Sequence, residues 1–285
     1  DLFREIAYIP AHYRVLFIGA PTRAHFAWIP QNFLQPGETA GYWVTGQWSQ
    51  AAYEEAKKVK TAYCIASTEA SNYRAIPARE TWHFKDNTAY TYLAPNETIH
   101  GVRFFPDITQ LSSPVIADMT SCLLTEPVDI SAYGMIIAGV QKNLANAGLS
   151  VVIVSDALLE CITDNRLATL SDYRTYARTG SLYATPPTFN CYVMLKVLSW
   201  IQTQGGVHTL HQKNLAKAKA LYDYLDHNDF YRSPVAPEAR SMVNIPFVCV
   251  DSTREATFVS EAEQHGLLGL AGHRLVGGMR ASIYN

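Results

Sequence analysis

The stretch formed by residues 135–154 constrains the fold of this chain more than any other. Two apolar runs rich in β-branched residues, 135–138 and 149–154, flank the polar group Gln141-Lys142-Asn143. Each run has the length and the composition of a buried strand. The stretch therefore predicts two core strands joined by a loop that carries a lysine.

Lys142 is the first candidate for chemistry. A lysine held between two buried strands is poorly solvated, so its ammonium form is disfavoured and a neutral amine becomes available for imine formation. A capping or surface lysine is the alternative interpretation. Asp118 follows another short apolar run, 114–117. A carboxylate there either binds a ligand at the carboxyl end of a strand or caps the next turn. In the first case Asp118 and Lys142 line one edge of the sheet.

The remaining patterns predict alternating strands and helices. Further strands are expected at 13–18, 63–66, 88–93, 134–139, 244–250 and 277–284, and helices at 24–34, 49–60, 185–204, 207–226 and 254–265. The alternation up to residue 205 predicts an α/β fold with a mostly parallel sheet covered on both faces. The order changes to β, α, β afterwards, so we expect a large domain at 1–206 and a small α+β domain at 207–285.

Two segments invite a functional interpretation. The turn Ala20-Pro21-Thr22-Arg23 joins a predicted strand to a predicted helix, where free N–H groups make an anion seat; an ordinary turn is the alternative. The predicted helix 185–204 is apolar on most of its faces. Such a helix belongs at the centre of a domain or in a dimer interface.

Residues 155–182 are polar and rich in Arg and Tyr, and we expect a long surface excursion there.

Composition excludes several classes of protein. With 48% hydrophobic and 17% charged residues and a net charge of -2, the chain is globular and has no electrostatic reason to bind nucleic acid or an anionic membrane. No apolar run approaches the roughly eighteen residues that span a bilayer, and no signal peptide is recognisable. The five cysteines form no C-x-x-C pair. We therefore expect neither a disulfide framework nor a metal site, and a reducing cytoplasm.

The chain resembles the phosphoserine aminotransferases, which are class V enzymes of fold type I that depend on pyridoxal 5'-phosphate. The stretches that carry this resemblance occur in family order over nearly the whole chain: YRVLF, AGYW, EEAKK, APNETIHG, VIADMTS, YGMIIAGVQKNLANAGLSVVIV, ATPPTF, NDFYRSPV and GHRLVGGMRASIYN. The resemblance implies a homodimer with its active site at the subunit interface. It also implies an N-terminal segment with a His-Arg pair and a final helix, neither of which is among these 285 residues.

The resemblance implies a role for four residues around the cofactor ring. Lys142 would form the Schiff base and move the proton. Asp118 would pair with the pyridinium nitrogen and keep it protonated. Trp43, from the AGYW stretch, would stack on the ring, and Thr98, from the NET stretch, would hydrogen-bond its phenolic oxygen.

Further residues would hold the phosphate and the substrate. The cofactor phosphate would rest on the backbone of Thr22 and Arg23, on Gln141 and on Thr185 of the partner subunit. The substrate α-carboxylate would be held by a bidentate pair with Arg280. The substrate phosphate, with its roughly two negative charges, would meet three basic residues: Arg23, His273 and Arg274.

Two departures from the family pattern concern the phosphate. The family turn usually reads Gly-Gly-(Gly/Ala), whereas this chain has Ala20-Pro21-Thr22. Glycine permits a positive φ and a close backbone approach, and Pro21 also lacks an N–H donor. Ala184 stands where the family commonly has Asn. We therefore expect looser phosphate binding.

The expected activity is transfer of the amino group of glutamate to 3-phosphohydroxypyruvate in serine biosynthesis, and to a related phosphorylated keto acid in vitamin B6 synthesis. Its partners are small molecules. One alternative is a divergent homologue that keeps the fold and the dimer but binds the cofactor poorly or not at all. Another class V enzyme, such as a cysteine desulfurase, lacks support because no cysteine lies on an obvious mobile loop. A nucleotide-binding α/β protein would need a Gly-rich fingerprint that this chain lacks.

Overall fold

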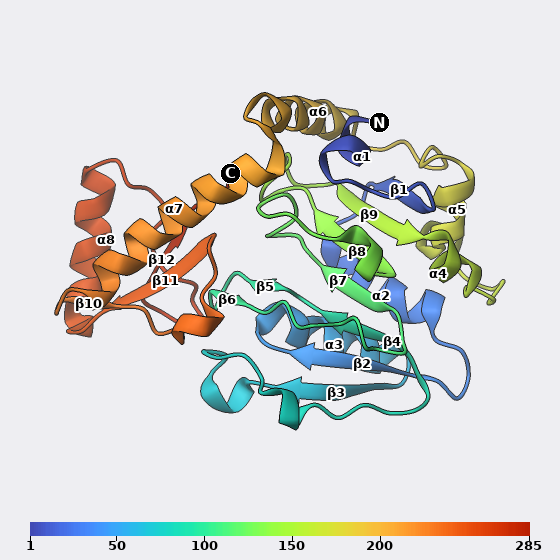
Figure 1. Cartoon of the computed structure of the whole chain (residues 1–285), viewed down its shortest axis with the longest axis horizontal. Helices are drawn as coiled ribbons and strands as arrows, with labels where there is room; N and C mark the ends of the chain where they lie inside the picture. The colour runs from blue at the N-terminus through green and yellow to red at the C-terminus, as the bar shows by residue number, and fades with distance from the viewer.

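A computed structural model describes all residues, 1–285, and contains a large and a smaller β-sheet joined by one long helix, besides a two-stranded ribbon (Figure 1). The larger sheet has seven strands in the order β1-β9-β8-β7-β4-β2-β3. Their bounds are β1 (Tyr13–Ile18), β2 (Thr39–Val44), β3 (Ala62–Ser67), β4 (Thr88–Leu93), β7 (Val115–Asp118), β8 (Met135–Gly139) and β9 (Ser150–Ser155). Only β9 runs against its neighbours, β1 and β8. The mostly parallel sheet expected from the sequence is confirmed.

Helices cover both faces of this sheet, and each face has its own hydrophobic core. One face carries α1 (Leu2–Ile6) and α6 (Thr188–Thr203). The other carries α2 (Thr22–Phe33), α3 (Gln47–Val59), α4 (Asp156–Glu160) and α5 (Tyr173–Arg178). Since successive strand residues point to opposite faces, Tyr42 and Trp43 of β2 lie in different cores.

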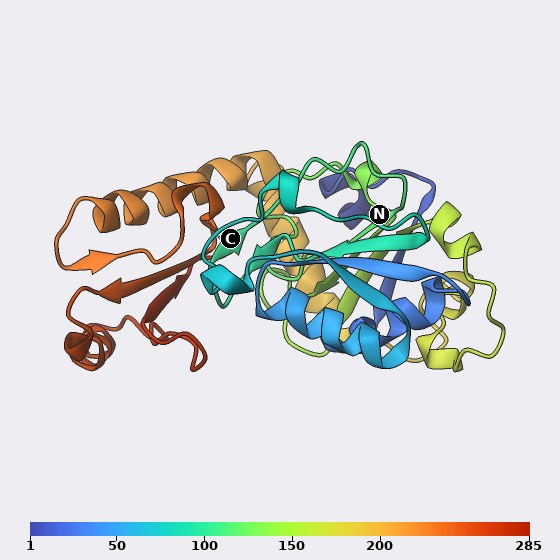
Figure 2. The ribbon, with the colours of Figure 1, turned by 90° about the horizontal axis from the view of Figure 1, so that it is seen from below.

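The smaller sheet lies beyond α7 (Gly206–Asp226) and contains β10 (Tyr231–Arg232), β11 (Asn244–Cys249) and β12 (Met279–Ser282). Figure 2 shows α7 and α8 (Glu255–Gln264) flanking this sheet. Tyr222, Phe247 and Met279 belong to its core. The domain boundary expected near Val207 falls in the first turn of α7 and stays a prediction.

The connections contain short elements. A two-stranded ribbon is formed by β5 (Asn96–Glu97) and β6 (Val102–Arg103). Short 3-10 helices occur at Glu69–Ser71, Arg79–Thr81, Ile130–Ala132, Thr169–Ser171, Pro237–Ala239 and Ser252–Arg254. None of the helices in the structure is both long enough and apolar enough to cross a bilayer.

The prediction of a surface excursion at 155–182 was wrong in part. The segment contains α4 and α5, and Tyr173 in α5 is fully buried at 0% exposure. Its ring stacks on those of His25 and Phe33 in α2. A tyrosine has a large apolar ring as well as a hydroxyl. A segment rich in tyrosine can therefore form part of the core, although its composition looks polar.

Candidate active site

A cavity of about 250 Å³ opens at the edge of the large sheet where its parallel strands end. Because only β9 is reversed, the carboxyl ends of the other six strands lie along this edge, and five of these strands lead into the cavity. Ligands of open α/β sheets bind at this position. Polar and aromatic side chains that follow these strands line it: Thr22 after β1, Trp48 after β2, Asn96 after β4, Asp118 on β7, and Gln141 and Lys142 after β8.

Lys142 lies in the loop between β8 and β9, as the sequence predicts, and its amine points into the cavity. Nζ donates to Thr98 Oγ1 at 3.4 Å and lies 5.4 Å from the centre of the Trp48 ring. Burial lowers the pKa of the ammonium below its ordinary value, and the Asp118 carboxylate opposes this shift. The amine is therefore easier to deprotonate than a surface lysine.

Asp118 is the last residue of β7 and is 7% exposed. Its Oδ1 accepts two hydrogen bonds from Thr120, from N at 3.0 Å and from Oγ1 at 2.5 Å. Burial raises the pKa of this carboxyl, and the bonds from Thr120 oppose the shift. No hydrogen bond in the structure reaches Oδ2, so the carboxylate keeps one acceptor for a group in the cavity.

The tryptophan at the cavity is Trp48, whereas the resemblance implied Trp43. Trp43 is fully buried and contacts the aromatic rings of Trp82, Phe84 and Phe104, away from the cavity. Trp43 belongs to a strand and points to one face of the sheet. Trp48 follows the end of that strand, in the first turn of α3, and so reaches the cavity at the sheet edge.

Glu97 fixes Trp48 in place and was not singled out from the sequence. Its fully buried carboxylate accepts hydrogen bonds from Trp48 N at 2.9 Å and from Ser49 N at 2.7 Å. An acid at a helix start satisfies open N–H groups and complements the dipole. Gly46 permits this contact, because a Cβ there would collide with the carboxylate. The polar sequence around Glu97 does not predict that its side chain caps the start of a helix about fifty residues earlier in the chain.

The start of α2 forms a second wall of the cavity. Pro21 is the N-cap residue, and no side chain caps the helix, so its first N–H groups are available to an anion. The side chains of Thr22 and Gln141 converge above Gly139, where a Cβ atom would collide with both. Arg23 lies with Cζ 5.0 Å from the centre of the Trp48 ring. The expected seat of Thr22, Arg23 and Gln141 is thus assembled from two separate loops.

Arg280 reaches the site from β12 of the small sheet. Its Nη1 donates to the carbonyl oxygen of Thr98 at 2.9 Å, and its Nε is buried without any partner. An unpaired buried guanidinium nitrogen is costly, so a ligand with an acceptor would relieve it. Asn96, in the ribbon strand β5, contacts the small sheet, since its Nδ2 donates to Asn244 Oδ1 in β11 at 2.9 Å. Arg280 lies on β12, which pairs with β11.

Three residues expected at the site lie elsewhere in the single chain. Thr185 and Arg274 are exposed, and His273 is half-buried in the loop before β12. None of them lines the cavity that holds Lys142. Within one subunit the structure therefore does not bring them together with the other predicted residues.

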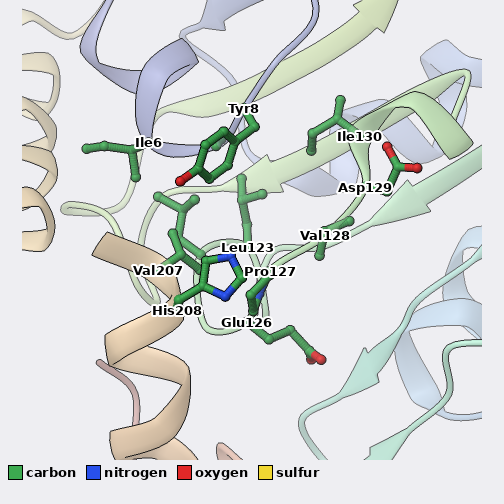
Figure 3. Close-up of a pocket in the computed structure, with 12 residues that line it drawn as sticks. Ile6, Tyr8, Leu123, Glu126, Pro127, Val128, Asp129, Ile130, Val207 and His208 are labelled. Carbon is green, nitrogen blue, oxygen red and sulfur yellow. The ribbon is translucent and has the colours of Figure 1, made fainter. Parts of the chain in front are cut away.

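A second cavity of about 250 Å³ lies between α1, the loop 123–130 and the start of α7 (Figure 3). Tyr8 and His208 lie on opposite sides of it, and most of the other lining residues are apolar. Of the two acids that line it, Glu126 is paired with Arg103, and the Asp129 side chain accepts from Ser131. None of the expected site residues lines this cavity, so the chemistry belongs to the cavity with Lys142.

The sequence model of the family described as Aminotransferase class-V matches residues 1–285. The chain belongs to this family. It is 50% identical over 283 residues to the phosphoserine aminotransferase of Legionella pneumophila (strain Corby), covering 99% of this chain and 78% of the relative. The solved phosphoserine aminotransferase from Bacillus circulans subsp. alkalophilus superposes with a TM-score of 0.95 at 43% identity, over 99% of this chain and 78% of the other. A pyridoxal-phosphate-bound phosphoserine aminotransferase from Trichomonas vaginalis superposes with a TM-score of 0.93 at 35% identity, over 99% and 81%.

This class-V aminotransferase is a pyridoxal-phosphate-dependent enzyme that acts on small molecules. The cavity fits that cofactor chemically. It offers a buried amine at Lys142 and a carboxylate with a free oxygen at Asp118. An uncapped helix start and the Gln141 amide suit a phosphate.

Proposed function

We propose that this class-V aminotransferase is a phosphoserine aminotransferase, which transfers the amino group of glutamate to 3-phosphohydroxypyruvate. The observation that carries the proposal is that two arginines, Arg23 and Arg280, lie near the one buried amine of Lys142. Arg23 and Lys142 both approach the Trp48 ring, and Arg280 lies close enough to Lys142 to lower the pKa of its amine further. A keto acid with a carboxylate at one end and a phosphate at the other matches this charge pattern.

Bound pyridoxal phosphate supplies a carbonyl that carries the amino group and a ring that accepts electrons. In our proposal Lys142 would hold the cofactor through Nζ, and the free amine, whose pKa is lowered by burial, would accept and release the proton that is moved. Asp118 Oδ2 would accept a hydrogen bond from the ring nitrogen of the cofactor, and Trp48 would offer an aromatic surface to the ring. We assign this last role to Trp48 because Trp43 is sealed inside the core.

Thr98 connects three of these groups. Its Oγ1 accepts from Trp48 Nε1 at 3.0 Å and from Lys142 at 3.4 Å, which leaves its own proton for an acceptor in the cavity. We assign that proton to the phenolic oxygen of the cofactor. Its carbonyl oxygen accepts from Arg280, the proposed ligand of the substrate α-carboxylate.

The phosphate of the cofactor would be held by the first N–H groups of α2, at Thr22 and Arg23, and by the Gln141 amide. The Arg23 guanidinium is directed to the Trp48 ring and remains available for the substrate phosphate. Arg23 and Lys142 both lie beside the Trp48 ring. Two positive charges in a partly buried site attract the doubly charged phosphate of the substrate strongly.

We further propose that two copies of the chain complete each site. The α6 face and the segment before it expose several large apolar side chains: Leu182 at 74%, Phe189 at 65%, Tyr192 at 56% and Leu195 at 51%. A patch of this kind favours a protein interface. A second copy packed there would bring Thr185, His273 and Arg274 toward a cavity that they do not line in their own chain. The five cysteines, none of them in a disulfide, fit a cytoplasmic protein.

The test uses the purified chain loaded with pyridoxal phosphate. Glutamate alone should convert the absorbance of the lysine-linked cofactor to that of the free amine form. 3-Phosphohydroxypyruvate should then restore the first spectrum, and hydroxypyruvate without phosphate should do so far less well. A protein that stays colourless with the cofactor, or that prefers the unphosphorylated keto acid, would overturn the proposal. Borohydride reduction followed by peptide mapping should place the cofactor on Lys142.

A further inference from the structure

The phosphate seat and the carboxylate of Asp118 are joined by two threonine hydroxyls. Thr22, in the first turn of α2, and Thr120, two residues after Asp118, both line the cavity. Their Oγ1 atoms lie 3.3 Å apart, although the residues come from distant parts of the chain. Thr120 Oγ1 in turn donates to Asp118 Oδ1 at 2.5 Å. The contacts form a continuous path from the α2 start to the acid.

Counting protons on Thr120 fixes the direction of this path. A threonine hydroxyl has one proton and two lone pairs. The proton of Thr120 goes to the Asp118 carboxylate, and one lone pair accepts from Gly139 N at 3.0 Å. The remaining lone pair can only accept, so Thr22 must be the donor of the 3.3 Å contact. Thr22 therefore holds a proton in a long, weak hydrogen bond.

The backbone around Thr22 is short of donors. Pro21, the N-cap residue, has no N–H to donate. Thr22 is 8% exposed, and its Oγ1 lies over Gly139, where a Cβ atom would collide with it. Its hydroxyl lies on the wall that an anion at this helix start would contact. Turning the proton from Thr120 to that anion would replace a weak bond by a charge-assisted one.

We propose that the Thr22 hydroxyl is a side-chain ligand of the cofactor phosphate that takes the place of the N–H missing from Pro21, and that Thr120 is a positioning residue that orients Asp118. This proposal rests on the proposed function only in that the cavity binds pyridoxal phosphate. Thr120 acts through Asp118, because its two hydrogen bonds occupy Oδ1 and leave Oδ2 for the ring nitrogen. Thr22 acts on the phosphate directly.

The two roles predict different losses. Thr22→Val keeps the shape of the side chain and removes the proton, so affinity for pyridoxal phosphate should fall about tenfold or more. Affinity for pyridoxal, which has no phosphate, should not change. Thr22→Ser should restore the affinity for pyridoxal phosphate. Thr120→Val should weaken both ligands alike and shift the pH dependence of the absorbance of the bound cofactor, because Asp118 loses a donor.

Binding is measured by quenching of tryptophan fluorescence in the full chain, and the ³¹P chemical shift of the bound cofactor reports on the phosphate itself. The matched control is Thr125→Val, since Thr125 is a buried threonine that donates to the carbonyl oxygen of Cys122, outside the cavity. Thr22→Ala serves if Thr22→Val does not fold. Equal losses for pyridoxal and pyridoxal phosphate in Thr22→Val, or no loss at all, would overturn the assignment of Thr22. An unchanged pH dependence in Thr120→Val would overturn that of Thr120. Failure of the unchanged chain to bind the cofactor would instead contradict the proposed function.

Discussion

The indole of Trp48 donates a hydrogen bond from Nε1 to Thr98 Oγ1 at 3.0 Å. This oxygen also accepts from the Lys142 amine, so the aromatic wall and the amine share one acceptor. The arrangement fixes the plane of the indole beside the cavity.

The two tryptophans should respond to substitution in different ways. Trp48→Ala should weaken binding of pyridoxal phosphate about tenfold, because it removes the stacking surface, with little loss of stability. Trp43→Ala should lower the free energy of unfolding by about 3–5 kcal/mol, because it leaves a cavity in the core. Cofactor titration and urea denaturation of both variants check this. A larger loss of affinity for pyridoxal phosphate in Trp43→Ala than in Trp48→Ala would contradict our assignment.

Asp118→Asn retains the shape of the side chain and removes its charge. We expect kcat to fall on the order of 100- to 1,000-fold, because the ring nitrogen loses the carboxylate that keeps it protonated. Asp156→Asn is the control, since Asp156 forms only an exposed pair with Arg14. Single-turnover kinetics with glutamate measure both. Retention of full activity by Asp118→Asn would refute the role of this carboxylate.

Arg280→Lys should raise KM for glutamate about tenfold or more, because a lysine cannot form the bidentate pair that a planar guanidinium forms with a carboxylate. Affinity for pyridoxal phosphate should stay the same. Arg254→Lys, in an exposed pair with Asp251, is the matched control. Steady-state kinetics with glutamate as the varied substrate provide the measurement. Equal KM values for Arg280→Lys and the unchanged chain would exclude a direct contact.

His25 should make the stability of the fold depend on pH. Its ring is fully buried between Tyr173 OH and Ser150 Oγ, each at 2.7 Å, and burial lowers the pKa of the imidazole to about 3. In the unfolded chain the pKa is about 6.5. Below that pH the imidazole is protonated in the unfolded state but stays neutral in the folded state. The free energy of unfolding therefore decreases as pH falls from about 6.5 toward 3.

Substitution of His25 by Gln tests this dependence. The stability of the unchanged chain relative to His25→Gln should fall by about 2 kcal/mol between pH 7 and pH 5. Urea denaturation at both pH values measures the difference. The exposed His227, changed to Gln, supplies the control. Parallel pH profiles for the unchanged chain and His25→Gln would mean that His25 titrates normally.

The proposed dimer can be tested on the exposed face of α6. Leu195→Glu places a charge where the second copy would pack, and we expect the dissociation constant of the dimer to rise at least about a hundredfold. Leu268→Glu, at a leucine that is 78% exposed in the small C-terminal region, should have no effect. Sedimentation velocity over a range of concentrations distinguishes them. A monomeric unchanged chain would contradict the interface.

Local sequence patterns predicted the elements around the reactive amine well. The strand at 88–93 has the bounds of β4, and the apolar runs on both sides of Lys142 form β8 and β9. Asp118 ends its strand as expected. These features follow from β-branched composition and from the length of each run, which act within a few residues. The resemblance added the cofactor, which no local pattern indicates.

The sequence by itself determined the order of the strands and helices, the lysine between two buried strands and the acid at the end of a third. Only the tertiary structure decided that Trp48 rather than Trp43 faces the cavity, that Glu97 caps α3, and that Thr22 lies beside Thr120. Each of these depends on contacts between segments remote in the chain. Periodicity reports the face on which a side chain lies, whereas the partner across a sheet edge is set by how the strands are ordered and packed.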